Sequence, residues 1–316
     1  MTRASLRGAL AVVVLLALAT PSPVHAATKP IPPNTISFWN SQRGLTGGGS
    51  PYFNSPGKIS LTTDGGHTFR TVLRTDGGVI WLDTAGTRDA WAVVKANSED
   101  QYLLHTGDGG ETWETVLPWV TEWSPAFASP RIGLAVTGAE AYDDFSGNTK
   151  FVATNDGGAT WERRPSPCPS NAESALVTMA SAERSWAMCM FDAGIGMQGK
   201  MVYRTTDGGD HWERLVNVKF GDCDAGMCSL GYPVGMSFSH GLGFMWQSGE
   251  FGYLTRTGGR HWSLAREVRL AYSASVVSSQ TGFVLTYSHH GIRLVKTDDA
   301  GHGWSDVHHW KRAAPE

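Results

Sequence analysis

Short segments of alternating apolar and polar residues recur along the chain in pairs, with a polar turn inside each pair. In segments 79–94, 174–191 and 271–287 an alternating strand leads through the turn into a second strand of small and apolar residues. The other pairs cover 36–49, 125–138 and 234–247. A period of two residues is typical of half-buried β-strands, and nothing in the pattern indicates a long helix. We therefore expect an all-β protein.

An octet of the form Thr-x-Asp-Gly-Gly-x-Thr-Trp follows each pair, and we call it the repeat turn. The four regular copies begin at Thr62, Thr106, Thr154 and Thr205. Two worn copies follow: Thr257 replaces the aspartate in the fifth, and Ala300 and Gly303 replace a glycine and the threonine in the sixth. The copies recur about every 40 to 50 residues, which is the length of a four-stranded propeller blade.

The residue types of the repeat turn suit a tight hairpin that packs against a neighbour. The glycines supply backbone conformations with positive φ, and the aspartate can accept nearby backbone N–H groups. The final aromatic residue begins the next strand and is large enough to anchor one sheet on another. We assign these structural roles to Asp64, Asp108, Asp156, Asp207 and Asp299, and to Phe69, Trp113, Trp161, Trp212, Trp262 and Trp304.

Six such units fill residues 34–310. The prediction is one six-bladed β-propeller of four-stranded antiparallel blades within residues 27–316, with seven blades as the second interpretation. Another Thr75-Asp76-Gly77-Gly78 follows the first repeat turn too closely to hold a further blade, so we expect a loop between blades there.

The repeat turn resembles the Asp-box, or BNR repeat, with the pattern Ser/Thr-x-Asp-x-Gly-x-Thr-Trp. Proteins that share this box include bacterial sialidases, xyloglucan-degrading glycosidases, sortilin-type receptors and photosystem II assembly factors of the WD40/YVTN/BNR-like class. The resemblance covers nearly all of the chain after residue 26 and implies a sialidase-like β-propeller. It does not imply one chemistry, because the activities of these proteins differ.

Residues 1–26 have the pattern of a secretory signal peptide: Arg3 and Arg7, an apolar run over 9–19, and small residues around Ala26. The apolar run is shorter than the roughly 20 residues that span a bilayer, which disfavours a membrane anchor. No later stretch is long and apolar enough to span. We expect a mature chain without a transmembrane span that is secreted or extracytoplasmic.

Four cysteines would meet an oxidising compartment after export, where an even number indicates disulfides. Of the three pairings, we favour Cys168 with Cys189 and Cys223 with Cys228. A zinc site is the alternative, but the spacing lacks paired Cys-x-x-Cys knuckles.

Composition limits the classes of partner. The 316 residues are 41% apolar and 17% charged, with a net charge of −3, and loss of Arg3 and Arg7 with the signal makes the mature chain about −5. There is no basic footprint for nucleic acid. The pairs His289-His290 and His308-His309 cannot readily chelate one ion, because adjacent strand residues point to opposite faces. We expect no metal, no cofactor and a monomer.

In propellers of this kind, the repeat turns share one face, the turn face, with the turns between the first and second strands. The opposite loop face carries the loops between the second and third strands and the links between blades, and it is where ligands usually bind. Our ligand-binding candidates are Trp119, Trp123, Glu140, Tyr142, Asp143, Asp144, Asp222 and Asp224. The alternatives are burial between blades for the tryptophans and solvated loops for the acids.

Sialidases use three arginines, a tyrosine nucleophile with a glutamate, and an acidic proton donor. Between the signal and the first repeat turn this chain has one arginine, Arg43, in a non-matching sequence. Tyr232 and Tyr272 enter innermost strands, yet no glutamate stands beside either in the sequence. Xyloglucan-degrading relatives use two propellers, which needs a longer chain. The favoured hypothesis is a non-catalytic binding or scaffolding module for a protein or glycan on the loop face, and the alternative is an exo-sialidase-like glycoside hydrolase.

Overall fold

The computed structural model describes residues 31–50, 55–96, 101–120, 123–137, 150–249 and 251–311. The chain divides into two units, Met1–Pro30 and Ile31–Glu316, and every described residue belongs to the second. The described part consists of strands and turns and contains no helix.

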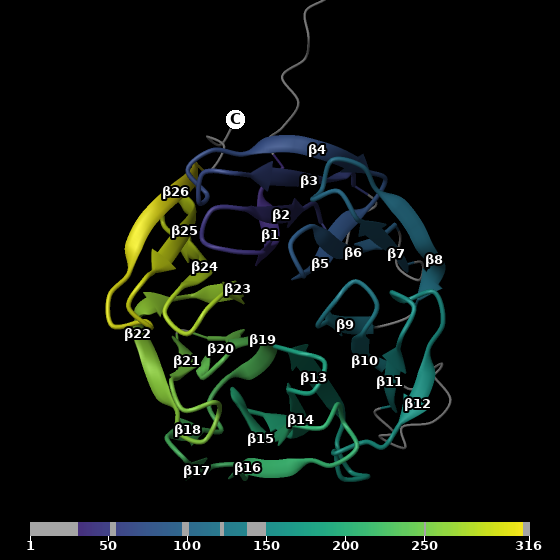
Figure 1. Cartoon of the computed structure of the whole chain (residues 1–316). Coiled ribbons are helices and arrows are strands. Elements are labelled where there is room, and N and C mark those ends of the chain that lie inside the picture. The colour runs from purple at the N-terminus through teal and green to yellow at the C-terminus, as the bar shows by residue number, and fades with distance from the viewer. Residues whose placement is uncertain are drawn as a thin grey trace, which may run out of the picture. The chain divides into compact units, whose positions relative to one another are not determined.

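The strands form six four-stranded sheets, the blades, together with one small hairpin (Figure 1). Blade 1 is β1 (Pro33–Phe38), β2 (Gly44–Gly48), β3 (Gly57–Thr62) and β4 (Arg70–Thr75), and blade 2 is β5 (Gly78–Ala85), β6 (Asp89–Lys95), β7 (Gln101–Thr106) and β8 (Glu114–Val120). Blade 3 is β9 (Trp123–Phe127), β10 (Gly133–Thr137), β11 (Lys150–Thr154) and β12 (Glu162–Arg164), and blade 4 is β13 (Ser174–Met179), β14 (Ser185–Gly194), β15 (Met197–Thr205) and β16 (Glu213–Val218). The hairpin is β17 (Cys223–Asp224) and β18 (Met227–Cys228). Blade 5 is β19 (Tyr232–Ser239), β20 (Leu242–Ser248), β21 (Phe251–Thr255) and β22 (Ser263–Arg269), and blade 6 is β23 (Ala271–Val276), β24 (Gly282–Ser288), β25 (Gly291–Thr297) and β26 (Ser305–Lys311).

Each blade is an antiparallel meander whose strands follow one another in sequence. The first strand of every blade lies at the centre of the ring and the fourth lies at the rim (Figure 1). The six-bladed prediction is confirmed. The segment Thr75-Asp76-Gly77-Gly78 is the link from β4 to β5, as expected.

The repeat turns close in the same way in each regular copy. In the third copy, the Thr154 hydroxyl donates to the Asp156 carboxylate (2.7 Å) and accepts the Gly158 N–H (2.9 Å). The same carboxylate accepts the N–H and the hydroxyl of Thr160. The hydroxyl and N–H of Thr160 are the main reasons why the pKa of Asp156 falls to about 2.

The two worn copies form the same turn with different residues. In the fifth copy, the Thr257 hydroxyl accepts the His261 N–H (2.8 Å) in place of the aspartate. In the sixth, Asp299 accepts the Gly303 N–H (2.9 Å), and Ala300 adopts a φ of +60° where the regular copies have glycine. The backbone path is therefore retained where the sequence signal fades.

The backbone of the fourth residue of each repeat turn ties the turn to the rest of the ring. In every copy, the N–H of its fourth residue donates to a carbonyl in the first-to-second-strand turn of the same blade, for example Gly157 to Arg131 at 3.0 Å. The carbonyl of that residue accepts from a side chain of the preceding blade in four copies. The pairs, each written with the donor side chain first and the acceptor carbonyl second, are Arg43 and Gly109, Trp91 and Gly157, Trp186 and Gly258, and Arg256 and Ala300.

Aromatic stacks fill the space between blades behind these turns. Trp91 on β6 lies flat on Phe127 of β9 with ring centroids 3.7 Å apart, and Trp186 on β14 stacks on Phe238 of β19 at 4.2 Å. Both tryptophans are fully buried. Phe38 of β1 stacks on Phe283 of β24 at 3.8 Å.

The last contact closes the ring without a shared strand, because blades 1 and 6 are each built from one continuous segment. Closure instead uses inner-strand side chains: the N–H groups of Ile36 and Phe38 donate to the hydroxyls of Ser273 and Ser275 (3.0 and 2.9 Å). Side-chain hydrogen bonds and one aromatic stack therefore join the two ends of the propeller.

The favoured cysteine pairing is confirmed by disulfides Cys168–Cys189 and Cys223–Cys228. The first ties the link before blade 4 to β14, and the second closes the β17–β18 hairpin.

Replacing Trp91 by alanine removes a stack and an inter-blade hydrogen bond at one site. We expect Trp91→Ala to lower the free energy of unfolding by about 3 to 5 kcal/mol. The measurement is urea unfolding followed by tryptophan fluorescence. Ile195→Ala, at a side chain that is 92% exposed, should stay within about 0.5 kcal/mol of the parent. Equal stabilities of the two variants would contradict the role given to the stack.

The lowered pKa of the repeat-turn aspartate leads to a second prediction, which concerns the pH dependence of stability. Because the folded pKa of Asp156 lies below its unfolded value, its stabilisation is present above about pH 4 and is lost as the pH falls towards 2. Asp156→Asn should lower the melting temperature at pH 6, and the difference from the parent should shrink as the pH falls from 4 to 2. A difference that stays constant over this range would show that the carboxylate charge has no part in the turn.

Candidate functional site

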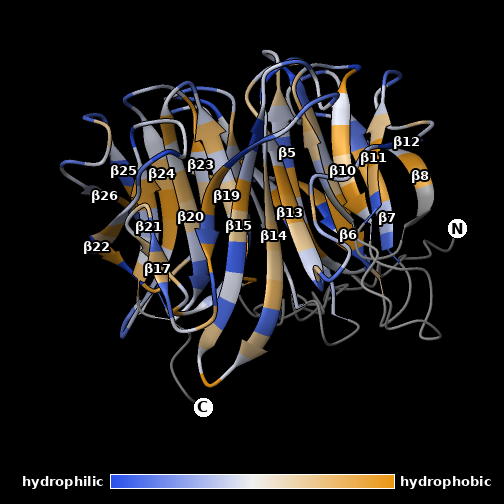
Figure 2. Ribbon diagram, turned by 90° about the horizontal axis from the view of Figure 1, so that it is seen from below, coloured by the Kyte–Doolittle hydropathy of each residue, from blue (hydrophilic) through white to orange (hydrophobic). Residues whose placement is uncertain are grey.

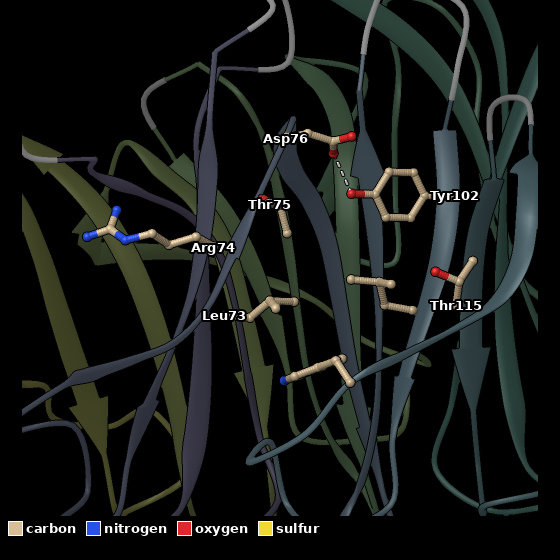
Figure 3. A pocket seen from close by; sticks show the side chains of 8 residues that line it. Leu73, Arg74, Thr75, Asp76, Tyr102 and Thr115 are labelled. Carbon is tan, nitrogen blue, oxygen red and sulfur yellow. Dashed lines mark hydrogen bonds between the residues drawn. The ribbon is translucent and has the colours of Figure 1, made fainter.

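A cavity lies on the rim of the ring between blades 1 and 2, and we call it the rim groove. It holds about 510 Å³, within the range of ligand sites, and β4 forms one wall while β7 and β8 form the other (Figure 3). Its lining residues are Leu73, Arg74, Thr75, Asp76, Tyr102, Leu104, Trp113 and Thr115.

The rim groove has an apolar floor and a polar end. Leu73, Leu104 and Trp113 supply the floor. At the end nearest the loop face, the Tyr102 hydroxyl donates to the Asp76 carboxylate at 2.5 Å (Figure 3). Burial and this carboxylate together raise the pKa of the Tyr102 phenol far above its usual range. The phenol therefore remains a neutral hydrogen-bond donor.

Two basic residues, Arg74 and Lys58, belong to the sheet that forms the β4 wall of the groove. The Arg74 side chain points away from the other lining residues (Figure 3). Its register partner across the sheet is Lys58, whose pKa is lowered first by burial and then by the Arg74 charge. Because register partners share a face of the sheet, both basic side chains lie on the face of blade 1 that is turned away from the groove.

Two glycines place Asp76 at the groove. A Cβ on Gly77 would lie 2.0 Å from the Lys95 carbonyl, and one on Gly57 would lie 2.2 Å from the Gly77 carbonyl. Three backbone segments therefore cross here at a distance that only glycine allows. The sequence signal for this crossing was Thr75-Asp76-Gly77-Gly78, which predicts a loop but not a groove.

A second feature is an apolar patch on the loop face, formed by Ile195, Phe220 and Leu230. Their exposed fractions are 92%, 46% and 59%. Ile195 is the tip of the β14–β15 hairpin, which protrudes past the other described strands with an apolar end (Figure 2). A Cβ on Gly194 would touch the Phe220 ring at 3.8 Å, and Leu230 bridges Met197 on β15. The three residues therefore lie on neighbouring backbone segments at the loop-face end of blade 4.

A buried lysine forms hydrogen bonds with the backbone next to the patch. The Lys200 ammonium donates to the carbonyls of Leu230 and Gly231 (3.2 and 3.3 Å) and to the Gln247 side chain (3.5 Å). Burial lowers the pKa of Lys200 to about 8. These bonds fix the segment 219–231 on blades 4 and 5.

Among the described residues that line the central channel is the carboxylate of Asp83. Asp83 on β5 accepts the N–H groups of Phe127 (2.6 Å) and Thr84 (3.1 Å), and it lines a cavity of about 80 Å³ among inner-strand hydroxyls. Burial raises the pKa of Asp83 to about 7, although these two N–H groups lower it.

The sequence-predicted candidates are scattered. Asp222 and Asp224 lie in the exposed segment 219–231, where Asp224 accepts the Asn217 N–H at 2.7 Å. Trp119 lies on β8 and Trp123 on β9, but their side chains are outside the described part. Glu140, Tyr142, Asp143 and Asp144 lie outside the described residues.

The two candidate nucleophiles begin inner strands, as expected. The Tyr232 hydroxyl accepts the Gly196 N–H at 2.9 Å on the loop face. The Tyr272 hydroxyl donates to the Pro33 carbonyl at 3.1 Å, and the ring stacks on Tyr287. Burial raises the pKa of Tyr272 far above its usual value. Tyr272 therefore behaves as part of the closure between blades 6 and 1.

Within the described ranges, no group of three or more His, Cys, Asp or Glu side chains is placed to hold a metal ion. No helix in the part that the structure describes is long and apolar enough to cross a membrane.

Solved propeller structures share this fold at low sequence identity. TolB from Acinetobacter baumannii is 13% identical with a TM-score of 0.59, over 86% of this chain and 63% of that one. An α-L-arabinanase from Penicillium chrysogenum, complexed with arabinobiose, is 13% identical with a TM-score of 0.58, over 89% and 96%. YCF48 bound to a D1 peptide is 15% identical over 87% and 81%, but its TM-score of 0.48 is too low to support an argument.

At these identities the likeness establishes the propeller fold alone. No family model matches the chain, and no curated protein matches it.

The raised pKa of Asp83 predicts that stability depends on pH in the opposite direction to the effect of the repeat-turn aspartates. Because its folded pKa is raised, folded Asp83 stays protonated between about pH 4 and 7 while the unfolded chain ionises, so stability falls as pH rises through this range. Asp83→Asn should remove a penalty of up to about 4 kcal/mol at pH 8. Melting temperatures at pH 4 and 8 test this, and a variant with no gain relative to the parent at pH 8 would contradict it.

Proposed function

We propose that this chain is an exported Asp-box β-propeller that binds a protein partner on its loop face without catalysing a reaction. The observation that carries the proposal is the apolar patch of Ile195, Phe220 and Leu230. Monomeric proteins rarely gather large exposed apolar side chains in one place unless that surface meets a partner.

The support beneath the patch suits recognition. The Cys223–Cys228 disulfide and the three Lys200 hydrogen bonds fix the segment that carries Phe220 and Leu230. A pre-organised surface loses little conformational entropy on binding. The two disulfides are also compatible with the exported state proposed from residues 1–26.

The glycosidase hypothesis has less support from the same geometry. Tyr272 is enclosed with its hydroxyl on Pro33, and Tyr232 accepts a backbone N–H. A nucleophilic tyrosine needs an adjacent base to remove its proton.

A matched pair of variants tests the binding surface. Ile195 lies on the loop face, and Ile132, which is 38% exposed, lies in a turn of the opposite face. The purified mature chain is immobilised and used to capture a partner from the extracytoplasmic fraction of the source organism. The captured partner is then purified, and its binding to the parent and to each variant is measured by isothermal titration calorimetry. We expect Ile195→Asp to weaken binding at least tenfold and Ile132→Asp to leave it within twofold.

Equal weakening by both variants, or by neither, would contradict the assignment to the loop face. Turnover of a glycoside panel by the parent that Tyr232→Phe abolishes would replace the proposal with the glycosidase.

A further inference from the structure

The rim groove has an internal counterpart between blades 4 and 5. Counted from the repeat turns, Leu73 and Thr75 hold the places of Val216 and Val218, and Leu104 and Trp113 hold those of Tyr253 and Trp262. The strand registers agree, since Leu104 pairs with Thr115 as Tyr253 pairs with Leu264. The two grooves are built on the same framework.

The counterpart groove is filled by the chain itself. The β17–β18 hairpin lies at the rim beside β16 and blade 5 (Figure 1). Its Met227 is fully buried in one cluster with Val216, Val218, Tyr253 and Trp262. The Ala225 carbonyl accepts the Trp262 N–H at 2.7 Å, and the Cys228 N–H donates to the Tyr253 hydroxyl at 3.1 Å.

The filled groove shows which features of a polypeptide fit. Gly226 lets the turn approach the wall, because a Cβ there would lie 2.0 Å from the Trp262 carbonyl. Met227 supplies an unbranched apolar side chain, and the Asp224 carboxylate accepts the Asn217 N–H. Trp262 is only 1% exposed beneath this turn, whereas Trp113 in the rim groove is half-buried.

The backbone at the edge of the rim groove favours an acidic residue in the bound turn. Arg74 holds the place of Asn217, which meets Asp224 in the filled groove. The strand registers agree here too, since Arg74 pairs with Lys58 as Asn217 pairs with Met201. A carboxylate in the place of Asp224 would therefore accept the backbone N–H of Arg74.

We propose that the rim groove is a second polypeptide-binding site, which takes a tight acidic turn of a partner protein with a buried methionine-like side chain. The site is separate from the loop-face patch. The partner's turn would repeat on blades 1 and 2 the packing that the β17–β18 hairpin makes on blades 4 and 5.

The chain supplies its own probe. A fluorescein-labelled peptide of residues 219–231, closed by the Cys223–Cys228 disulfide, is titrated with the full mature protein by fluorescence anisotropy. We expect saturable one-to-one binding. Thr115→Trp, which fills the groove from an exposed strand position, should weaken it at least tenfold. Thr71→Trp, on an exposed β4 residue that does not line the groove, should leave it within twofold.

Peptide variants test the chemistry. Met227→Ser in the peptide should weaken binding at least tenfold, and Asp224→Asn about threefold or more. Ile195→Asp in the protein should change nothing, which separates this site from the loop-face proposal. Absence of saturable binding would overturn the inference. Binding that Thr115→Trp leaves intact would overturn it as well, because the peptide would then be displacing the native hairpin and not entering the rim groove.

Discussion

The propeller depends on the backbone of one residue, the fourth of each repeat turn. Its N–H donates within the blade, and in four blades its carbonyl receives a hydrogen bond from the preceding blade, as with Trp91 on Gly157. The backbone of one residue thus connects the hairpin to its own blade and to the neighbouring blade. The geometry needs a positive φ, which explains both the glycine of the regular copies and the strained Ala300 of the last.

This arrangement explains why the fold could be predicted from the sequence. The octet is local, so its glycines, aspartate and final tryptophan carry the turn, the strand start and the blade anchor within a few residues. Thr257 shows how far the signal can fade: a hydroxyl replaces the carboxylate and still accepts the N–H of His261. The blade number followed from the spacing of these turns, and the cysteine pairing followed from proximity along the chain.

The candidate sites were harder to predict because they depend on contacts between blades. The rim groove joins Leu73 to Trp113 across two sheets, and no local pattern marks that contact. Asp224 was singled out as a ligand-binding acid, yet it holds the Asn217 N–H beside the hairpin that fills the counterpart groove. Tyr272 was singled out for its place on an inner strand, and its hydroxyl faces the backbone of β1 at the seam of the ring. These contacts join residues of different blades, so no local sequence pattern predicts them.

The central claim is that a rigid propeller uses its open surfaces to bind polypeptide, and that one groove has the shape of a turn the chain already carries. Hydrogen–deuterium exchange of the full protein, with and without the disulfide-closed peptide 219–231, tests this most directly. The account predicts slower exchange in segments 73–76, 102–104 and 113–117, with segments 216–218 and 253–264 unchanged. Protection confined to the second pair of segments, or no protection at all, would contradict it.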